Sequence, residues 1–169
     1  MKKILFVCSG NTCRSPLAEG IASKTLSDRT QIPTEVSSAG SSAFEGMPAS
    51  QHAANVALQH GVDLSHHRSR LLNTKSVREA DLIVTMGNKH MKTVGVIDPE
   101  ALSYTVLLTD FCDETGDVHD PIGGDQAEYE RIYALIERCV TAMADSLDGY
   151  ERWKSEKRGK TGDDSGESP

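Results

Sequence analysis

A change of hydrophobic period within the first 26 residues constrains the fold more than any other feature. Residues 3–8 form a short apolar run typical of a buried strand, and residues 9–11 (Ser-Gly-Asn) end it with turn chemistry. From Ser15 onward, apolar residues recur at spacings of three and four, and Pro16 suits the first turn of a helix capped by Ser15. The pattern predicts a strand, a tight loop and a helix.

The same order of elements continues along the chain. Further strands are predicted at 34–38, 82–85 and 104–108, and further helices between Pro48 and Gly61, around 89–94 and over 129–147. Strands that alternate with helices predict an α/β fold, here a Rossmann-like single domain with a four-stranded parallel sheet flanked by helices. A chain of 169 residues is long enough to bury one such core.

We place the domain at residues 1–150 and a tail at residues 151–169. From Lys154 to Pro169 the only apolar residues are glycine and proline, and half of the 16 positions are charged. A segment of this composition cannot bury enough apolar surface to fold by itself. We therefore expect the tail to be disordered.

Charge and hydropathy exclude several classes of protein. The 18 basic and 25 acidic side chains give a net charge of −7, opposite to that of a general nucleic-acid binder. No apolar run approaches the roughly 18 residues of a membrane helix, and the run after Lys2 and Lys3 is too short for a secretory signal. We expect a cytoplasmic protein that binds neither nucleic acid nor membrane.

The chain has four cysteines, Cys8, Cys13, Cys112 and Cys139. In a reducing compartment structural disulfides are rare, and a clustered pair is more typical of catalysis or redox chemistry. The four do not form two C-x-x-C pairs, so the sequence predicts no structural metal site.

The loop between the first strand and the first helix carries the chemistry. Its amides are expected to form an anion-binding nest above a helix N-terminus, and the Arg14 guanidinium can bind two phosphoryl oxygens together. Helix, amides and Arg14 all favour the thiolate of Cys8, which makes it a nucleophile at neutral pH. The predicted phosphate-binding residues are Ser9, Gly10, Asn11, Thr12, Cys13, Arg14 and Ser15.

Transfer of a phosphoryl group to Cys8 also requires a proton for the leaving group. Asp120 is the favoured donor because Pro121 holds it on a stiff loop, although Asp110, Asp113 and Asp117 compete for this role. Ser15 can donate a hydrogen bond to the Cys8 sulfur, and Asn11 can support the loop.

Several short segments together are similar to one known family. They are Cys8–Pro16 with Leu17-Ala18-Glu19, Ser38-Ala39-Gly40, His67-Arg68-Ser69-Arg70, Thr85-Met86 and Asp120-Pro121. They resemble the low-molecular-weight protein tyrosine phosphatases, over residues 1 to about 150. The resemblance implies hydrolysis without metal or cofactor through a phosphocysteine at Cys8, with Asp120 as general acid and then base. It also implies that Asn11, Ser15 and Ser38 form a hydrogen-bond network and that His67 supports the loop.

Two positions depart from the tyrosine-specific pattern of that family. Thr12 stands where an aliphatic residue is usual, and Ile122 and Gly123 replace consecutive aromatics after Asp-Pro. Only Phe44 remains as a candidate wall for a phenol ring. The loop and the Asp120 turn resemble the protein arginine phosphatase branch, although that branch tends to have an aromatic at the place of Ile122.

The preferred function is therefore a protein arginine phosphatase, with phosphorylated proteins as partners and inorganic phosphate as product and competitive inhibitor. A phosphotyrosine phosphatase of the same family is the alternative. A thiol-dependent arsenate reductase is a further class, disfavoured because Cys112 and Cys139 lie 27 residues apart. A reversible disulfide between Cys8 and Cys13 is a separate redox hypothesis.

Overall fold

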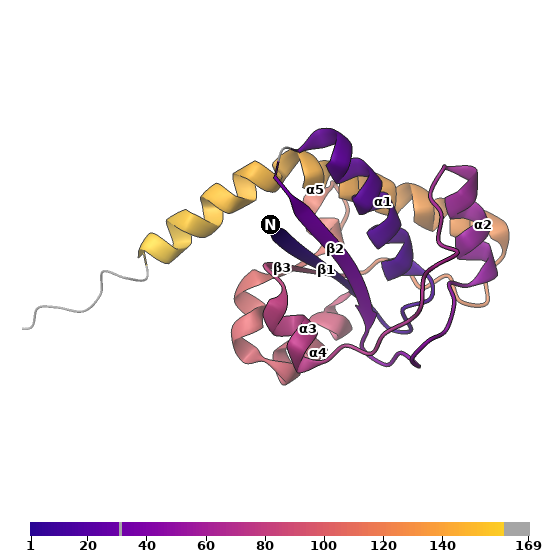
Figure 1. Cartoon of the computed structure of the whole chain (residues 1–169), viewed down its shortest axis with the longest axis horizontal. Helices are drawn as coiled ribbons and strands as arrows, with labels where there is room; N and C mark the ends of the chain where they lie inside the picture. The colour runs from indigo at the N-terminus through magenta and orange to yellow at the C-terminus, as the bar shows by residue number, and fades with distance from the viewer. Residues whose placement is uncertain (31, 161–169) are drawn as a thin grey trace, which may run out of the picture.

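The computed structural model describes residues 1–30 and 32–160, built around one four-stranded parallel sheet (Figure 1). The strands are β1 (Lys2–Cys8), β2 (Thr34–Gly40), β3 (Leu82–Thr85) and β4 (Thr105–Leu107). Their order in the sheet is β2-β1-β3-β4, and every pairing is parallel. The predicted α/β fold with four parallel strands is confirmed.

Helices cover both faces of the sheet. One face carries α1 (Arg14–Arg29), α2 (Gln51–Gln59) and α5 (Gln126–Lys160), and the other carries α3 (Thr74–Glu79), α4 (Asn88–Ile97) and the short η1 (Pro99–Tyr104). A further short turn, η2 (Leu108–Phe111), follows β4.

Strand β1 shows why the sheet is covered on both sides. Ile4 and Phe6 pack into the core beneath α1 and α5, whereas Leu5 and Val7 pack into the core on the α3 and α4 side. Successive side chains of a strand point to opposite faces of the sheet, so a continuous apolar run is buried on both faces.

The sequence pattern missed α3. This helix is only six residues long and buries a single side chain, Val77, so it has almost no apolar period to detect. The signal was at its start, where Asn73 and Ser76 form a reciprocal capping box.

Helix α5 is longer than predicted. It continues to Lys160, so the backbone of residues 151–160 is helical, although this segment was predicted to be disordered. Lysine, arginine and glutamate have high helix propensity, and extending an existing helix carries no nucleation cost. The rest of the predicted tail, residues 161–169, lies outside the described residues.

The cysteines differ from expectation. Cys112 and Cys139 form a disulfide, with their Cα atoms 5.0 Å apart, whereas Cys8 and Cys13 are free. Residue 112 directly follows η2, which packs against α5, so the fold brings together two cysteines that are 27 residues apart in sequence. The sequence argument expected structural disulfides to be rare in a reducing compartment and therefore missed the pair.

We expect loss of this disulfide to lower the free energy of unfolding by about 3 kcal/mol, because cross-linking a loop of this length removes entropy from the unfolded chain. Urea unfolding of the wild type with and without a dithiol measures the difference. Cys112→Ser is the matched control, and its transition should be the same under both conditions. Thiol labelling of the denatured, unreduced chain should modify two cysteines, Cys8 and Cys13; labelling of all four contradicts the prediction.

Candidate active site

The loop predicted to bind phosphate follows β1 at the carboxyl edge of the sheet. Cys8 is the last residue of β1 and lies beside Gly40, the last residue of β2. A Cβ on Gly40 would lie 2.4 Å from the Ser9 carbonyl oxygen and 2.9 Å from the Asn11 amide nitrogen. Glycine at this position therefore lets β2 approach the loop closely.

Asn11 organises the loop from within. It is fully buried and is the only non-glycine residue with a positive φ, 55°, among residues 1–30 and 32–160. Its Nδ2 donates to Ser15 Oγ and to Ser38 Oγ, each at 2.9 Å, and its carbonyl lies 2.7 Å from His67 Nε2. Ser38 and His67 thus lie where the family resemblance implied, and their bonds hold a conformation that few side chains adopt.

The loop has two supports that sequence reasoning did not assign. The Arg70 amide donates to Asn11 Oδ1 at 2.8 Å, and Ser38 Oγ in turn donates to the carboxylate of Glu19. Glu19 also pairs with the Arg70 side chain at 3.8 Å. Both residues stand in the segments that carry the family resemblance, which was the available signal.

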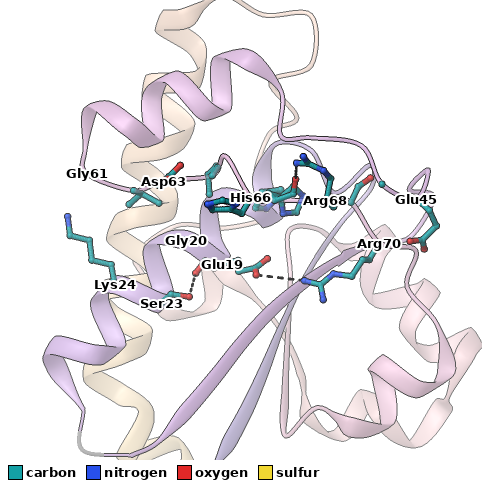
Figure 2. A pocket seen from close by; sticks show the side chains of 16 residues that line it. Glu19, Gly20, Ser23, Lys24, Glu45, Gly61, Asp63, His66, Arg68 and Arg70 are labelled. Carbon is teal, nitrogen blue, oxygen red and sulfur yellow. Dashed lines mark hydrogen bonds and ion pairs between the residues drawn. The ribbon is translucent and has the colours of Figure 1, made fainter.

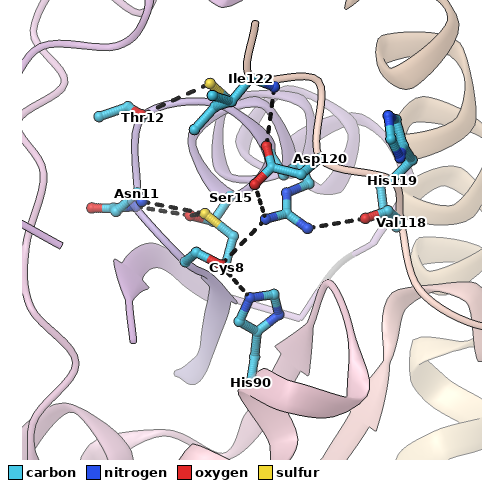
Figure 3. Close-up of polar contacts among 12 residues, drawn as sticks. Cys8, Asn11, Thr12, Ser15, His90, Val118, His119, Asp120 and Ile122 are labelled. Carbon is cyan, nitrogen blue, oxygen red and sulfur yellow. Dashed lines mark hydrogen bonds and ion pairs between the residues drawn. The ribbon is translucent and has the colours of Figure 1, made fainter. Parts of the chain in front are cut away.

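Cys8 lies at the start of the loop, and the residue is only 2% exposed. Ser15 Oγ lies 2.9 Å from it, and the Asn11 amide donates to it at 3.3 Å (Figure 3). Both groups therefore lie within hydrogen-bonding distance of the sulfur of the predicted nucleophile.

Ser15 does not cap the helix as predicted. Helix α1 begins at Arg14, Cys13 stands at the N-cap position, and no side chain caps it. The Ser15 hydroxyl instead contacts the Cys8 sulfur and accepts from Asn11 Nδ2. It therefore forms hydrogen bonds within the loop and does not cap the helix.

Arg14 is buried beneath the loop. Its Nη1 donates to the Val118 carbonyl at 3.0 Å and its Nη2 to Asp120 Oδ2 at 3.0 Å. Its Nε is buried without a hydrogen-bond partner in the part of the chain that the structure describes. A guanidinium held in this way keeps unused donor capacity for an anion.

Asp120 is the carboxylate that reaches Arg14, 106 residues away in sequence. Its Oδ1 accepts from the Ile122 amide at 3.2 Å, and its side chain is 35% exposed, so it is fixed and yet open to solvent. Of the competing carboxylates, Asp110 accepts from the Leu107 amide and Asp117 from Asn88.

Of the predicted specificity residues, Thr12 belongs to the loop and the Ile122 amide donates to Asp120. Thr12 is half-buried, whereas Phe44 and Ile122 are 83% and 65% exposed. Phe44 belongs to the segment that follows β2, and its carbonyl accepts a hydrogen bond from Ser69. The two exposed apolar candidates, Phe44 and Ile122, are thus far apart in sequence.

Cys13 faces away from the partners of Cys8. Its sulfur contacts Ser50 Oγ at 3.3 Å and Tyr129 OH at 3.3 Å. Burial, followed by the bond to Cys13, raises the pKa of Tyr129 to about 12, so this phenol stays protonated. The disulfide between Cys8 and Cys13 remains a prediction.

Two histidines near the site differ in their contacts. His119 adjoins Asp120 but pairs with Glu128 at 2.8 Å. His90 is fully buried, and its Nε2 lies 2.9 Å from Ser9 Oγ. Sequence reasoning assigned no role to His90, although its place shortly after β3, next to β1 in the sheet, could have indicated it.

A cavity of about 710 Å³ lies elsewhere, between α1 and residues 61–70 (Figure 2). Its walls carry both signs of charge. They include Glu19, His67 and Arg70, which support the phosphate loop through hydrogen bonds and an ion pair, but they do not include Cys8. This cavity is therefore separate from the site around Cys8. Among the side chains that the structure describes (residues 1–30 and 32–147), no cluster of three or more metal-binding groups occurs. No helix in the described part of the chain is long and apolar enough to cross a membrane.

Comparison with known proteins agrees with this geometry. Residues 3–152 match the family described as "Low molecular weight phosphotyrosine protein phosphatase". The chain is 35% identical over 144 residues to the low molecular weight protein-tyrosine-phosphatase Etp of Escherichia coli K12, covering 85% of this chain and 93% of Etp. The chain therefore belongs to the low-molecular-weight protein tyrosine phosphatase family, whose members are protein phosphatases.

A relative with a different named specificity matches equally well. The protein-arginine-phosphatase of Geobacillus stearothermophilus is 37% identical over 147 residues, covering 86% of this chain and 95% of that protein. The solved structure of the YwlE arginine phosphatase from Geobacillus stearothermophilus superposes with a TM-score of 0.80 at 34% identity, covering 90% of this chain and 97% of that one.

Proposed function

We propose that this chain is a protein phosphatase that hydrolyses phosphoarginine side chains through a phosphocysteine at Cys8. The observation that carries the proposal is the convergence of Cys8, Arg14 and Asp120 on one loop. Arg14 contacts Asp120 at 3.0 Å while the Cys8 sulfur accepts from Ser15 and Asn11. A nucleophile, an anion-binding cation and a proton donor are what phosphoryl transfer requires.

In the first step the Cys8 thiolate attacks phosphorus, and the bond from phosphorus to the substrate nitrogen breaks. Asp120 transfers its proton to that nitrogen, which leaves as arginine. Arg14 and the loop amides stabilise the equatorial oxygens, where negative charge gathers in the transition state.

In the second step water attacks the phosphocysteine. Asp120, now ionised, accepts a proton from the water, and the bond from sulfur to phosphorus breaks. The Ser15 hydroxyl, 2.9 Å from the sulfur, stabilises the departing thiolate. Inorganic phosphate is released, and it competes with substrate because it binds the same donors.

Thr12 and Asp120 support phosphoarginine over phosphotyrosine. The Thr12 hydroxyl can hydrogen-bond a guanidinium group, and the carbonyl oxygen of the protonated Asp120 can accept a hydrogen bond from it, a pairing that becomes ionic once Asp120 has given up its proton. A phenol ring needs flat apolar walls, and Phe44 and Ile122 are largely exposed.

We expect Thr12→Ile to shift the preference toward phosphotyrosine by about 10-fold or more, because the substitution removes the hydroxyl and adds apolar surface. The measurement is kcat/KM of wild type and variant on phosphoarginine and phosphotyrosine peptides of one sequence. The matched control is Thr12→Ser, which keeps the hydroxyl and should keep the preference for phosphoarginine.

Phosphotyrosine remains the second candidate substrate. The tyrosine phosphatase names of several relatives favour it. A wild type that prefers the phosphotyrosine peptide overturns the arginine assignment and leaves the phosphocysteine mechanism in place. We do not propose arsenate reduction, because Cys139 is fully buried in the core and neither it nor Cys112 contacts Cys8.

A further inference from the structure

His90 is brought to the phosphate loop by the topology of the sheet. It lies in the first turn of α4, shortly after β3, and β3 pairs directly with β1. In Figure 3 its ring points from α4 toward the loop that holds Cys8. Its Nε2 lies 2.9 Å from Ser9 Oγ, and Arg14 Nη2 donates to the same oxygen at 3.5 Å.

The other ring nitrogen fixes the direction of this hydrogen bond. His90 Nδ1 is buried and has no hydrogen-bond partner among the side chains and backbone described for residues 1–30 and 32–147. An N–H group buried without an acceptor costs more free energy than a bare ring nitrogen in the same place, and such orphaned donors are rare. The proton of the neutral ring therefore belongs on Nε2, which donates to Ser9 Oγ.

The surroundings keep the ring neutral. Burial and then the nearby charge of Arg14 lower the pKa of His90 to about 4, with Lys89 acting in the same direction and Asp117 and Asp120 against it. Ser9 Oγ then accepts from both His90 and Arg14, so its two lone pairs are used. Its own hydrogen remains available to donate.

We propose that His90 is a positioning residue of the phosphate site. Its neutral imidazole donates through Nε2 to Ser9 Oγ, and this directs the Ser9 hydroxyl to donate to an oxygen of the bound phosphoryl group. The inference rests on the proposed function, because it assigns an additional donor to the same anion site. It gives a role to a buried histidine that supplies neither nucleophile nor acid.

A double-mutant cycle tests whether His90 acts through Ser9. We expect His90→Phe to raise the dissociation constant of inorganic phosphate and to lower kcat/KM for an aryl phosphate about 3- to 10-fold, the effect of one neutral hydrogen bond. In a Ser9→Ala background the same substitution should change both quantities less than about 2-fold. Equal losses in both backgrounds indicate a merely structural role and overturn the proposal.

His90→Gln guards against a variant that fails to fold. Its amide NH₂ can donate to Ser9, so we expect it to recover most of the loss, and failure of a folded His90→Gln to do so contradicts the role. The ¹⁵N resonances of the His90 ring in the wild type give an independent readout, with a proton on Nε2 expected and a proton on Nδ1 overturning the proposal.

These measurements separate the inference from the proposed function. A wild type that binds phosphate but hydrolyses neither a phosphoarginine peptide nor the aryl phosphate contradicts the proposed function, while phosphate affinities across the four variants of the cycle still decide the role of His90. An active wild type with an additive cycle contradicts the role of His90 alone.

Discussion

Cys8→Ser is expected to abolish hydrolysis of phosphopeptides, with kcat falling by at least about 10⁴-fold. A serine hydroxyl remains protonated at neutral pH, so the loop loses its nucleophile. The donors that bind the anion remain, since the Asn11 amide and Arg14 are unchanged. Inorganic phosphate should therefore bind the variant with an affinity close to that of the wild type.

Rapid quenching of the wild type during turnover gives the direct control. Mass spectrometry should find one phosphoryl group on the peptide that contains Cys8, and none on that peptide from Cys8→Ala. A Cys8→Ser variant that retains more than a few per cent of the wild-type kcat would show that another group attacks phosphorus.

Asp120→Asn is expected to lower kcat on phosphopeptides by about 10²- to 10⁴-fold, the usual contribution of general acid catalysis. Asparagine is nearly the same size but cannot transfer a proton to the leaving group. The loss should be much smaller on an activated aryl phosphate, whose leaving group departs without protonation. The measurement is the ratio of kcat values of wild type and variant on the two substrates.

The neighbouring residue provides a matched control. His119 is exposed and pairs with Glu128, so His119→Asn should leave both kcat values within about 2-fold of the wild type. An Asp120→Asn variant with the same loss on both substrates contradicts the role of proton donor and indicates that Asp120 acts by holding Arg14.

Local sequence was sufficient for most of the fold. The strand at 82–85 was predicted with its observed bounds, and the change of period after residue 8 located the loop and α1. These features depend on residues close together in sequence, because a strand buried on both faces must be apolar throughout and an amphipathic helix repeats every 3.6 residues. Elements with little periodicity, such as α3, gave no comparable signal.

The loop from Cys8 to Ser15 could also be predicted, because its residues are adjacent in sequence. The pairing of Arg14 with Asp120 could not be predicted from spacing, because spacing alone left four aspartates as candidates. The contact itself comes from the packing of the segment before α5 against the loop, where the Val118 carbonyl also accepts from Arg14.

Sequence by itself thus indicated most of the strands and helices and led to the proposal of Cys8 and its loop as the reaction site, since each of these depends on short-range patterns. Tertiary structure decided which distant groups meet that loop, namely Asp120 and the buried His90, and it separately brought Cys112 and Cys139 together. The physical reason is that a parallel sheet gathers the carboxyl ends of all its strands at one edge, and the contacts made there depend on strand order and packing.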